Sequence, residues 1–277
     1  MSFRKVGTLK TIFIVTIILA LNYSQLAAQD IQKGLNAAQN GDFITAFKEW
    51  HPLAKQGDAH AQYLLGLVYD NGDGVSQNYA ESIKWYRLAS EQGHATAQAN
   101  LGLMYSNSGK GFQNFVEAEK WFRLSAKQGS AIGQNNLGVL YEFGDGVIQN
   151  YGESLRWYNL AVKQNYPEAQ YNIARMYSDG KGVDQSYAKA KIWYRLAAEQ
   201  GFAFAHYNLA FMYYNGNGVL QDHLRAHMWW TIAAGQNDKD AAKSRDTLAK
   251  KMTSANISKA QRMAKECLNS NYQNCGW

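Results

Sequence analysis

The sequence predicts an all-α protein, an α-solenoid in which pairs of helices stack into a right-handed superhelix. The main observation is an internal repeat of 36 residues, with predicted units at 59–94, 95–130, 131–166, 167–202 and 203–238. Three of the series that keep this interval are Trp85, Trp121, Trp157, Trp193 and Trp229; Tyr69, Tyr105, Tyr141, Tyr177 and Tyr213; and Gln92, Gln128, Gln164, Gln200 and Gln236. Because two helices cannot enclose a core alone, each unit must be buried by its neighbours.

The first part of each unit is predicted to be a helix with one apolar side. In the first unit, Ala61, Leu65 and Val68 recur at spacings of three and four. One position in this helix holds only small residues: Gly66, Gly102, Gly138, Ala174 and Ala210. Glycine inside a helix costs about 1 kcal/mol relative to alanine, so a small residue repeated here predicts that two helix backbones approach closely. A glycine-rich turn then ends the helix.

A second helix follows the turn, and its start is marked in every unit. The N-cap position holds residue types that accept hydrogen bonds from backbone N–H groups: Asn78, Asn114, Asn150, Ser186 and Asp222. Glu81, Glu117 and Glu153 follow three residues later, which predicts a capping box. The helix ends at Gly93, Gly129 or Gly201, or at Asn165 or Asn237, which tolerate the left-handed conformation.

These residues carry a resemblance to the Sel-1-like repeat, a relative of the TPR with a longer loop between its helices. The matching segments are residues 97–105 (Ala-Gln-Ala-Asn-Leu-Gly-Leu-Met-Tyr), 144–151 (Gly-Asp-Gly-Val-Ile-Gln-Asn-Tyr) and 193–201 (Trp-Tyr-Arg-Leu-Ala-Ala-Glu-Gln-Gly). The resemblance covers about residues 35–266 and extends to secreted bacterial members. It implies an N-terminal half-repeat or cap at 29–58, and a C-terminal helical cap with a disulfide-closed tail at 239–277.

The first residues predict export. Arg4, Lys5 and Lys10 precede an uncharged apolar run at 11–21, and Ala27-Ala28 form a small-residue cleavage site. A signal peptide at 1–28 places the mature protein in the periplasm or outside the cell. The alternative is an uncleaved anchor, but the run is shorter than the roughly 18 residues that a membrane span needs. No membrane span is expected after cleavage.

Cys267 and Cys275 are the only cysteines. An even pair that closes a short loop in an exported protein predicts a disulfide; two free thiols are the alternative. Without residues 1–28 the chain has 25 basic and 22 acidic residues, a net charge of +3 that we interpret as spread along the chain. Nucleic-acid binding, which needs a concentrated basic surface, is therefore not expected.

Two patterns that could carry chemistry are better explained by the repeat. Ser178 and Lys181 have the serine–lysine spacing of penicillin-recognising enzymes, but they fall in the region of the glycine-rich turn. His223 and His227 are four apart on a predicted helix and could face one metal ion. However, His223 occupies the position of Tyr79, Phe115, Tyr151 and Tyr187. We expect no catalytic, cofactor-binding or metal-ligating residues.

The candidate partner-binding residues lie on the first helix of the units, which commonly forms the concave surface of a solenoid. Tyr63, Tyr171 and Tyr207 share one position, and Arg175 and Phe211 replace aliphatic residues nearby. The alternative is that the tyrosines fill the seam between helices. A second series (Asn100, Asn136, Asn172 and Asn208) could contact a peptide backbone, although hydrogen bonds between adjacent helices are the favoured interpretation.

The sequence therefore predicts a monomeric scaffold that binds a protein or peptide on its concave face. The family resemblance implies envelope assembly, regulation of peptidoglycan enzymes or host-cell interaction as settings, with envelope or host proteins as partners. The alternatives are a penicillin-binding, β-lactamase-like or other cell-wall hydrolase, and a purely structural envelope component.

Overall fold

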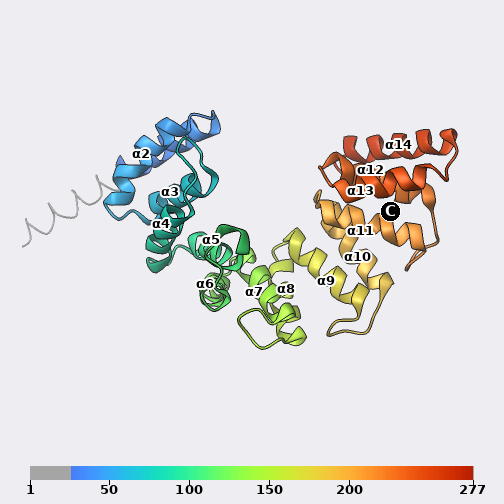
Figure 1. Ribbon diagram of the computed structural model, residues 1–277, viewed down its shortest axis with the longest axis horizontal. Coiled ribbons are helices and arrows are strands. Elements are labelled where there is room, and N and C mark those ends of the chain that lie inside the picture. The colour runs from blue at the N-terminus through green and yellow to red at the C-terminus, as the bar shows by residue number, and fades with distance from the viewer. Residues whose placement is uncertain (1–25, 277) are drawn as a thin grey trace, which may run out of the picture. The chain divides into compact units, whose positions relative to one another are not determined.

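The computed structural model describes residues 26–276, and every regular element in this part of the chain is a helix (Figure 1). The chain divides into two compact units, an N-terminal unit that ends at Gln128 and a C-terminal unit that begins at Gly129. Residues 1–25 of the predicted signal peptide lie outside the described residues, and residues 26–28 begin the first described helix. None of the described helices is both long and apolar enough to cross a membrane.

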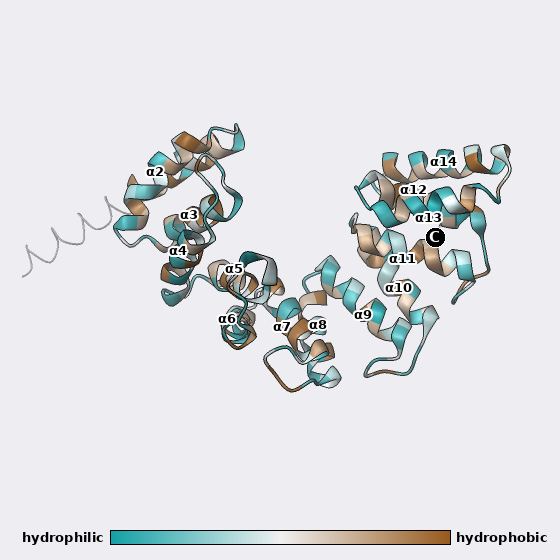
Figure 2. Cartoon of the chain, viewed as in Figure 1, coloured by the Kyte–Doolittle hydropathy of each residue, from teal (hydrophilic) through white to brown (hydrophobic). Residues whose placement is uncertain are grey.

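The N-terminal unit consists of antiparallel helix pairs. Its elements are a helix over residues 26–39, α2 (Phe43–Lys55), α3 (Ala59–Asn71), α4 (Tyr79–Glu91), α5 (Ala95–Ser106), the short 3₁₀ helix η1 (Ser108–Lys110) and α6 (Phe115–Lys127). Trp50, Leu53 and Leu65 are buried in the core shared by α2 and α3. Apolar and polar residues are interspersed along these helices (Figure 2). Helices α2 and α6 are amphipathic and pack on one side, whereas α5 is buried around most of its circumference.

The C-terminal unit continues the same pattern and ends in two further helices. Its elements are α7 (Ala131–Phe143), α8 (Tyr151–Val162), α9 (Pro167–Asp179), α10 (Tyr187–Ala198), α11 (Ala203–Asn215), α12 (His223–Gly235), α13 (Lys239–Ala249) and α14 (Ser254–Asn269). Tyr194, Leu209 and Trp229 belong to one buried cluster that also includes Leu248 of α13 and Cys267 of α14. The C-terminal helices therefore close the hydrophobic core of the last repeat.

The predicted N-caps are confirmed, but the predicted capping boxes are wrong. The side chain of Asn78 accepts a hydrogen bond from the Glu81 backbone N–H, and the other four N-cap residues do the same. In a capping box the Glu side chain also accepts a hydrogen bond from the backbone N–H of the N-cap residue. Here that N–H donates instead to a tyrosine carbonyl of the first helix, as from Asn78 to Tyr69 at 2.9 Å. The Glu81 carboxylate instead pairs with Lys84, and that of Glu153 with Arg156.

The repeated small residue makes room for an aromatic ring. An added Cβ at Gly66 would lie 2.3 Å from the Tyr86 ring, and one at Gly102 would lie 2.6 Å from the Phe122 ring. The space above the glycine is thus filled by an aromatic ring from the second helix of the same repeat. At Gly138 an added Cβ would lie 2.7 Å from the Tyr158 ring and also 3.2 Å from the backbone oxygen of Ser154 on α8, so the predicted close backbone approach is found in that copy.

Glutamines make the repeated hydrogen bond that was expected of the asparagines. The second-helix glutamine donates to a buried first-helix glutamine of the same repeat in four copies: Gln92 to Gln62, Gln128 to Gln98, Gln164 to Gln134 and Gln200 to Gln170, at 2.8–2.9 Å. Among the asparagines, Asn100 bonds the Tyr86 hydroxyl and Asn172 bonds Asn135, each on a neighbouring repeat as expected. Asn136 and Asn208 instead bond carbonyl oxygens of their own helices. Burial of the glutamine amides explains why they need fixed partners.

In the last repeat His206 replaces the first-helix glutamine. Its Nδ1 lies 3.0 Å from Gln236 Oε1, and its Nε2 lies 3.0 Å from the carbonyl oxygen of Ala198. The ring stacks between Trp229 and Tyr272, with ring centroids 5.5 and 5.0 Å away. Burial lowers the pKa of His206 below its ordinary value, although both hydrogen bonds oppose this. The neutral imidazole is therefore the form that the fold favours.

The free energy of unfolding is expected to fall as the pH is lowered from about 7 to about 5. Burial lowers the pKa of His94 and His227 as well as His206, so the unfolded chain takes up protons in this window before the folded chain does. Chemical denaturation at both pH values measures the change. His206→Gln, which restores the glutamine of the other repeats, should make the free energy of unfolding less dependent on pH. An unchanged pH dependence in this variant would show that His206 does not contribute to it.

Candidate functional site

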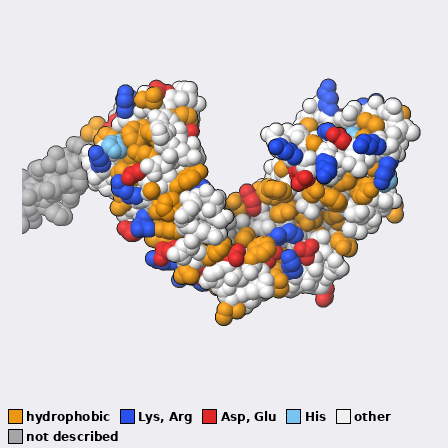
Figure 3. All heavy atoms as spheres, in the orientation of Figure 1, with side chains coloured by type: hydrophobic (Ala, Val, Ile, Leu, Met, Phe, Trp, Pro, Cys, Tyr) orange, Lys and Arg blue, Asp and Glu red, His pale blue; other side chains and the backbone are white. Residues whose placement is uncertain are grey.

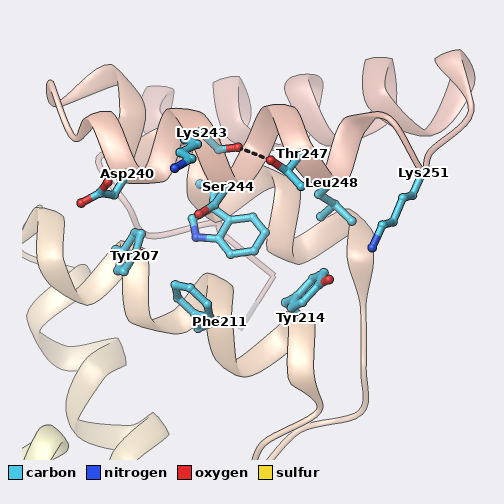
Figure 4. A pocket seen from close by; sticks show the side chains of 10 residues that line it. Tyr207, Phe211, Tyr214, Asp240, Lys243, Ser244, Thr247, Leu248 and Lys251 are labelled. Carbon is cyan, nitrogen blue, oxygen red and sulfur yellow. Dashed lines mark hydrogen bonds between the residues drawn. The ribbon is translucent and has the colours of Figure 1, made fainter.

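A pocket of about 340 Å³ opens between α11 and α13 in the C-terminal unit (Figure 4). Tyr207, Phe211 and Tyr214 follow one another at spacings of four and three on α11, so their side chains share one side of the helix. The opposite side of α11, with Leu209 and Met212, is buried in the core. The helix therefore packs through its aliphatic side and presents aromatic rings to the pocket.

The aromatic wall is a connected set of rings. The Tyr207 and Phe211 centroids lie 4.9 Å apart with their rings edge to face. Phe211 in turn meets Trp230 of α12 edge to face at 5.3 Å, and Tyr214 lies 5.5 Å from the same indole. Burial raises the pKa of Tyr207 above its ordinary value, which keeps the phenol neutral near pH 7. This wall offers rigid apolar area and a few hydroxyl groups.

The opposite wall is polar and comes from α13 and the residues that follow it. Its side chains recur at helical spacing, and they are Asp240, Lys243, Ser244, Thr247, Leu248 and Lys251. Helix α13 keeps the repeat phase: Ala241 and Leu248 are buried at the positions of Ala205 and Met212 in the preceding unit. The outward positions have instead become charged, with Lys243 at the position that Tyr207 occupies.

Two of the five predicted binding residues, Tyr207 and Phe211, are brought together in this pocket. Tyr171 instead packs against Tyr194, Phe202 and Phe204, with centroids 5.3–6.0 Å away. Tyr63 belongs to the N-terminal unit, where its ring stacks on His94 at 4.7 Å. Tyr63 and Tyr171 thus have the seam-filling role that was the alternative interpretation of these tyrosines.

Arg175 forms an ion pair in which the carboxylate is buried and the arginine side chain is partly exposed. Its Nη2 lies 2.6 Å from both carboxylate oxygens of Glu142, whose side chain is only 1% exposed. The Tyr158 hydroxyl donates to the same carboxylate at 2.9 Å. Since Glu142 is in α7 and Arg175 in α9, the pair joins two successive repeats. This geometry gives Arg175 a structural role.

The sequence patterns did not indicate Tyr214, Trp230 or the α13 residues of the pocket. Tyr214 did carry a signal, because its position holds Asp70, Ser106, Glu142 and Ser178 in the other units. Trp230 was hidden among the aromatic residues of the repeat core. Lys243 and Lys251 lie beyond the last full unit, where a search for periodicity gives no reason to single them out.

The residues with possible chemistry do not form a reactive arrangement. The Lys181 ammonium lies 3.4 Å from Asp179 and 3.8 Å from Glu142, so it pairs with carboxylates. His227 is buried, whereas His223 is exposed and stacks on Tyr214. Within residues 26–276, no group of three or more His, Cys, Asp or Glu side chains is placed to hold a metal ion.

Comparison with known proteins identifies the repeat. The Sel1 repeat model matches residues 59–94, 95–130, 131–166, 167–202 and 203–238. A protective antigen of uropathogenic Escherichia coli strains, which displays an SLR fold, is 33% identical with a TM-score of 0.68; the match covers 92% of this chain but only 57% of the antigen. A Sel1 repeat protein from Oxalobacter formigenes is 31% identical with a TM-score of 0.72, over 88% of this chain and 97% of that protein.

No curated protein sequence matches the chain. The repeat model nevertheless covers more than half of it, and both solved structures are more than 30% identical over most of its length. The stacked helix pairs, the five matched repeats and these relatives together show that this chain belongs to the Sel1 repeat family.

Proposed function

We propose that this protein is a monomeric binding scaffold of the bacterial cell envelope or secreted space, and that it holds a protein or peptide at the α11–α13 pocket. Sel1 repeat proteins are typically protein-interaction scaffolds, and their fold is generally non-catalytic. The first-helix side, where α11 presents its aromatic residues, is commonly the concave binding side of such stacks. The observation that carries the proposal is the aromatic wall of Tyr207, Phe211 and Tyr214.

The chemistry of the pocket suits a peptide. Aromatic side chains provide large contact areas with few rotatable bonds to immobilise, which is why they dominate the energetics of many interfaces. The volume of about 340 Å³ lies at the lower end of the range for ligand pockets and suits one or two side chains. The polar α13 wall adds hydroxyl, ammonium and carboxylate groups that can fix the orientation of a peptide.

The proposed location rests on the N-terminal sequence and is supported by the disulfide. Residues 1–28 have the order of a signal peptide. Cys267 and Cys275 form a disulfide, a bond that persists in oxidising compartments. An intact mass corresponding to a chain that begins at Gln29, measured on exported protein, would support the proposal, whereas an uncleaved chain in the cytoplasm would contradict it.

Binding is tested by selecting ligands from a displayed peptide library with the whole protein. Tyr207→Ala combined with Phe211→Ala should weaken the selected peptides at least tenfold, because each alanine removes a ring from the pocket. Thr247→Trp should also weaken binding, by filling the pocket from an exposed position without removing any core side chain.

The matched control is Ile148→Ala with Leu220→Ala, which removes two apolar side chains that are 91% and 90% exposed and do not line the pocket. Binding should persist in this control. Peptides that bind all of these variants equally would contradict the proposed function.

A further inference from the structure

The positive charge of the protein is concentrated in its C-terminal cap. Residues 239–277 contain eight Lys or Arg against three Asp or Glu, a net charge of +5. Residues 29–238 contain 17 basic and 19 acidic residues, a net charge of −2. The interpretation that the positive excess is spread along the chain is therefore wrong. Lys and Arg side chains gather over the C-terminal helices in Figure 3.

Two of these cations lie at the pocket between α11 and α13. Lys243 and Lys251 both line it, and both are exposed (Figure 4). Neither takes part in any of the ion pairs found among residues 26–276, whereas five other lysines there do have a carboxylate partner: Lys33, Lys84, Lys110, Lys120 and Lys181. Their ammonium groups are thus available to a charged ligand. Asp240 brings one negative charge to the same wall, at the end near Tyr207.

The spacing of the two lysines limits what can reach both. They are eight residues apart on and just after α13, and a rise of about 1.5 Å per residue separates their backbones by about 12 Å. An extended peptide rises about 3.3 Å per residue, so side chains four residues apart point the same way and are separated by about 13 Å. The side chain midway between them also points that way and would face the aromatic wall.

We propose that the α11–α13 pocket binds an extended acidic segment of a protein partner. An aromatic side chain of that segment enters the pocket against Phe211 and Trp230. Carboxylates two residues before and two residues after it pair with Lys243 and Lys251. This inference rests on the proposed function and adds the chemistry of the partner. Asp240 disfavours a further carboxylate beyond Lys243 and so limits how far the acidic segment extends.

The test is isothermal titration of the whole protein with designed peptides at low salt. The probe has the pattern Glu-Ser-Phe-Ser-Glu within a neutral peptide. It is compared with Gln-Ser-Phe-Ser-Gln, Glu-Ser-Ala-Ser-Glu and the permuted Phe-Ser-Ser-Glu-Glu. We expect the probe to bind at least fivefold more tightly than each of the three, since two exposed ion pairs contribute modestly and the aromatic anchor contributes more.

Matched charge variants locate the carboxylates. Lys243→Gln with Lys251→Gln should weaken the Glu probe about fivefold and leave the Gln peptide unchanged, whereas Asp240→Asn should strengthen the Glu probe. Lys259→Gln with Lys265→Gln removes the same charge from α14, away from the pocket lining, and should have a much smaller effect. Equal effects of the two lysine pairs would overturn the inference in favour of non-specific attraction to the basic cap.

Failure of the inference is distinguishable from failure of the proposed function. If library-selected peptides depend on Phe211 and Thr247 but show no preference for the Glu pattern, the acidic partner is wrong and the scaffold function stands. Tight binding of the permuted peptide would equally overturn the spacing. If neither the selected nor the designed peptides bind, both proposals are overturned.

Discussion

Replacing Arg175 with alanine is expected to lower the free energy of unfolding by about 3 kcal/mol. The Glu142 carboxylate is 1% exposed and receives two short contacts from the guanidinium. Removing one partner of a buried ion pair leaves an uncompensated charge, which typically costs about 3–5 kcal/mol. We expect the lower part of this range, because the Tyr158 hydroxyl and the more distant Lys181 ammonium remain near the carboxylate. Urea denaturation of the whole protein measures the effect.

The matched control removes the carboxylate charge together with the guanidinium. Arg175→Ala combined with Glu142→Gln should recover most of the lost stability, because a neutral amide at this site leaves no buried charge. A stable Arg175→Ala single variant would contradict the structural role of the pair. The result also matters for binding experiments, since a variant that lacks Arg175 could lose its partner through destabilisation rather than through loss of a contact.

Loss of the disulfide is expected to lower the free energy of unfolding by about 2.5 kcal/mol. Cys267 and Cys275 are both buried and close a short loop, and the entropy lost by the unfolded chain when such a loop is closed accounts for this magnitude. The loop also holds Tyr272, whose ring stacks on His206 and whose hydroxyl accepts a hydrogen bond from Gln236. Opening the loop should therefore loosen the end of the last repeat.

The measurement compares denaturation midpoints with and without reductant. Cys267→Ala combined with Cys275→Ala should behave like the reduced wild-type protein and should not respond to reductant. Hydrogen exchange should show faster exchange in the tail and around His206 in both cases. A reduced protein with the same midpoint and the same exchange would show that packing of α14, and not the covalent bond, holds the tail in place.

The repeat and its capping signals were predictable because they depend on local chemistry. Asn78 and Asp222 are N-caps in the structure because a side-chain oxygen at this place satisfies a backbone donor whatever the tertiary context. The capping box at Glu81 was predicted wrongly, and the ring that fills the space beside Gly66 was not predicted, because each depends on a non-local partner. Asn78 donates to a carbonyl of the preceding helix, and Gly66 accommodates the ring of Tyr86.

The candidate site was only partly predictable for a related reason. Tyr207 stood out because it shares its position in the 36-residue repeat with two other tyrosines. Phe211 stood out because it replaces an aliphatic residue of the other repeats. The second wall of the pocket depends on how α13 packs after the last repeat, and its outward residues no longer follow the pattern. Arg175 stood out for the same reason as Phe211, but its partner Glu142 lies 33 residues earlier, and the repeat gives no indication that the two side chains meet.

Photo-crosslinking tests most directly whether the chain acts through a binding surface at α11 and α13. The Glu-Ser-Phe-Ser-Glu peptide or a library-selected peptide would carry benzoylphenylalanine at its aromatic position, and mass spectrometry would locate the crosslinks on the protein. We expect crosslinks to residues 207–214 and 243–251 that disappear in Thr247→Trp. Crosslinks that map to the N-terminal unit or to the α9–α10 repeat, and that persist in this variant, would contradict a binding surface at α11 and α13.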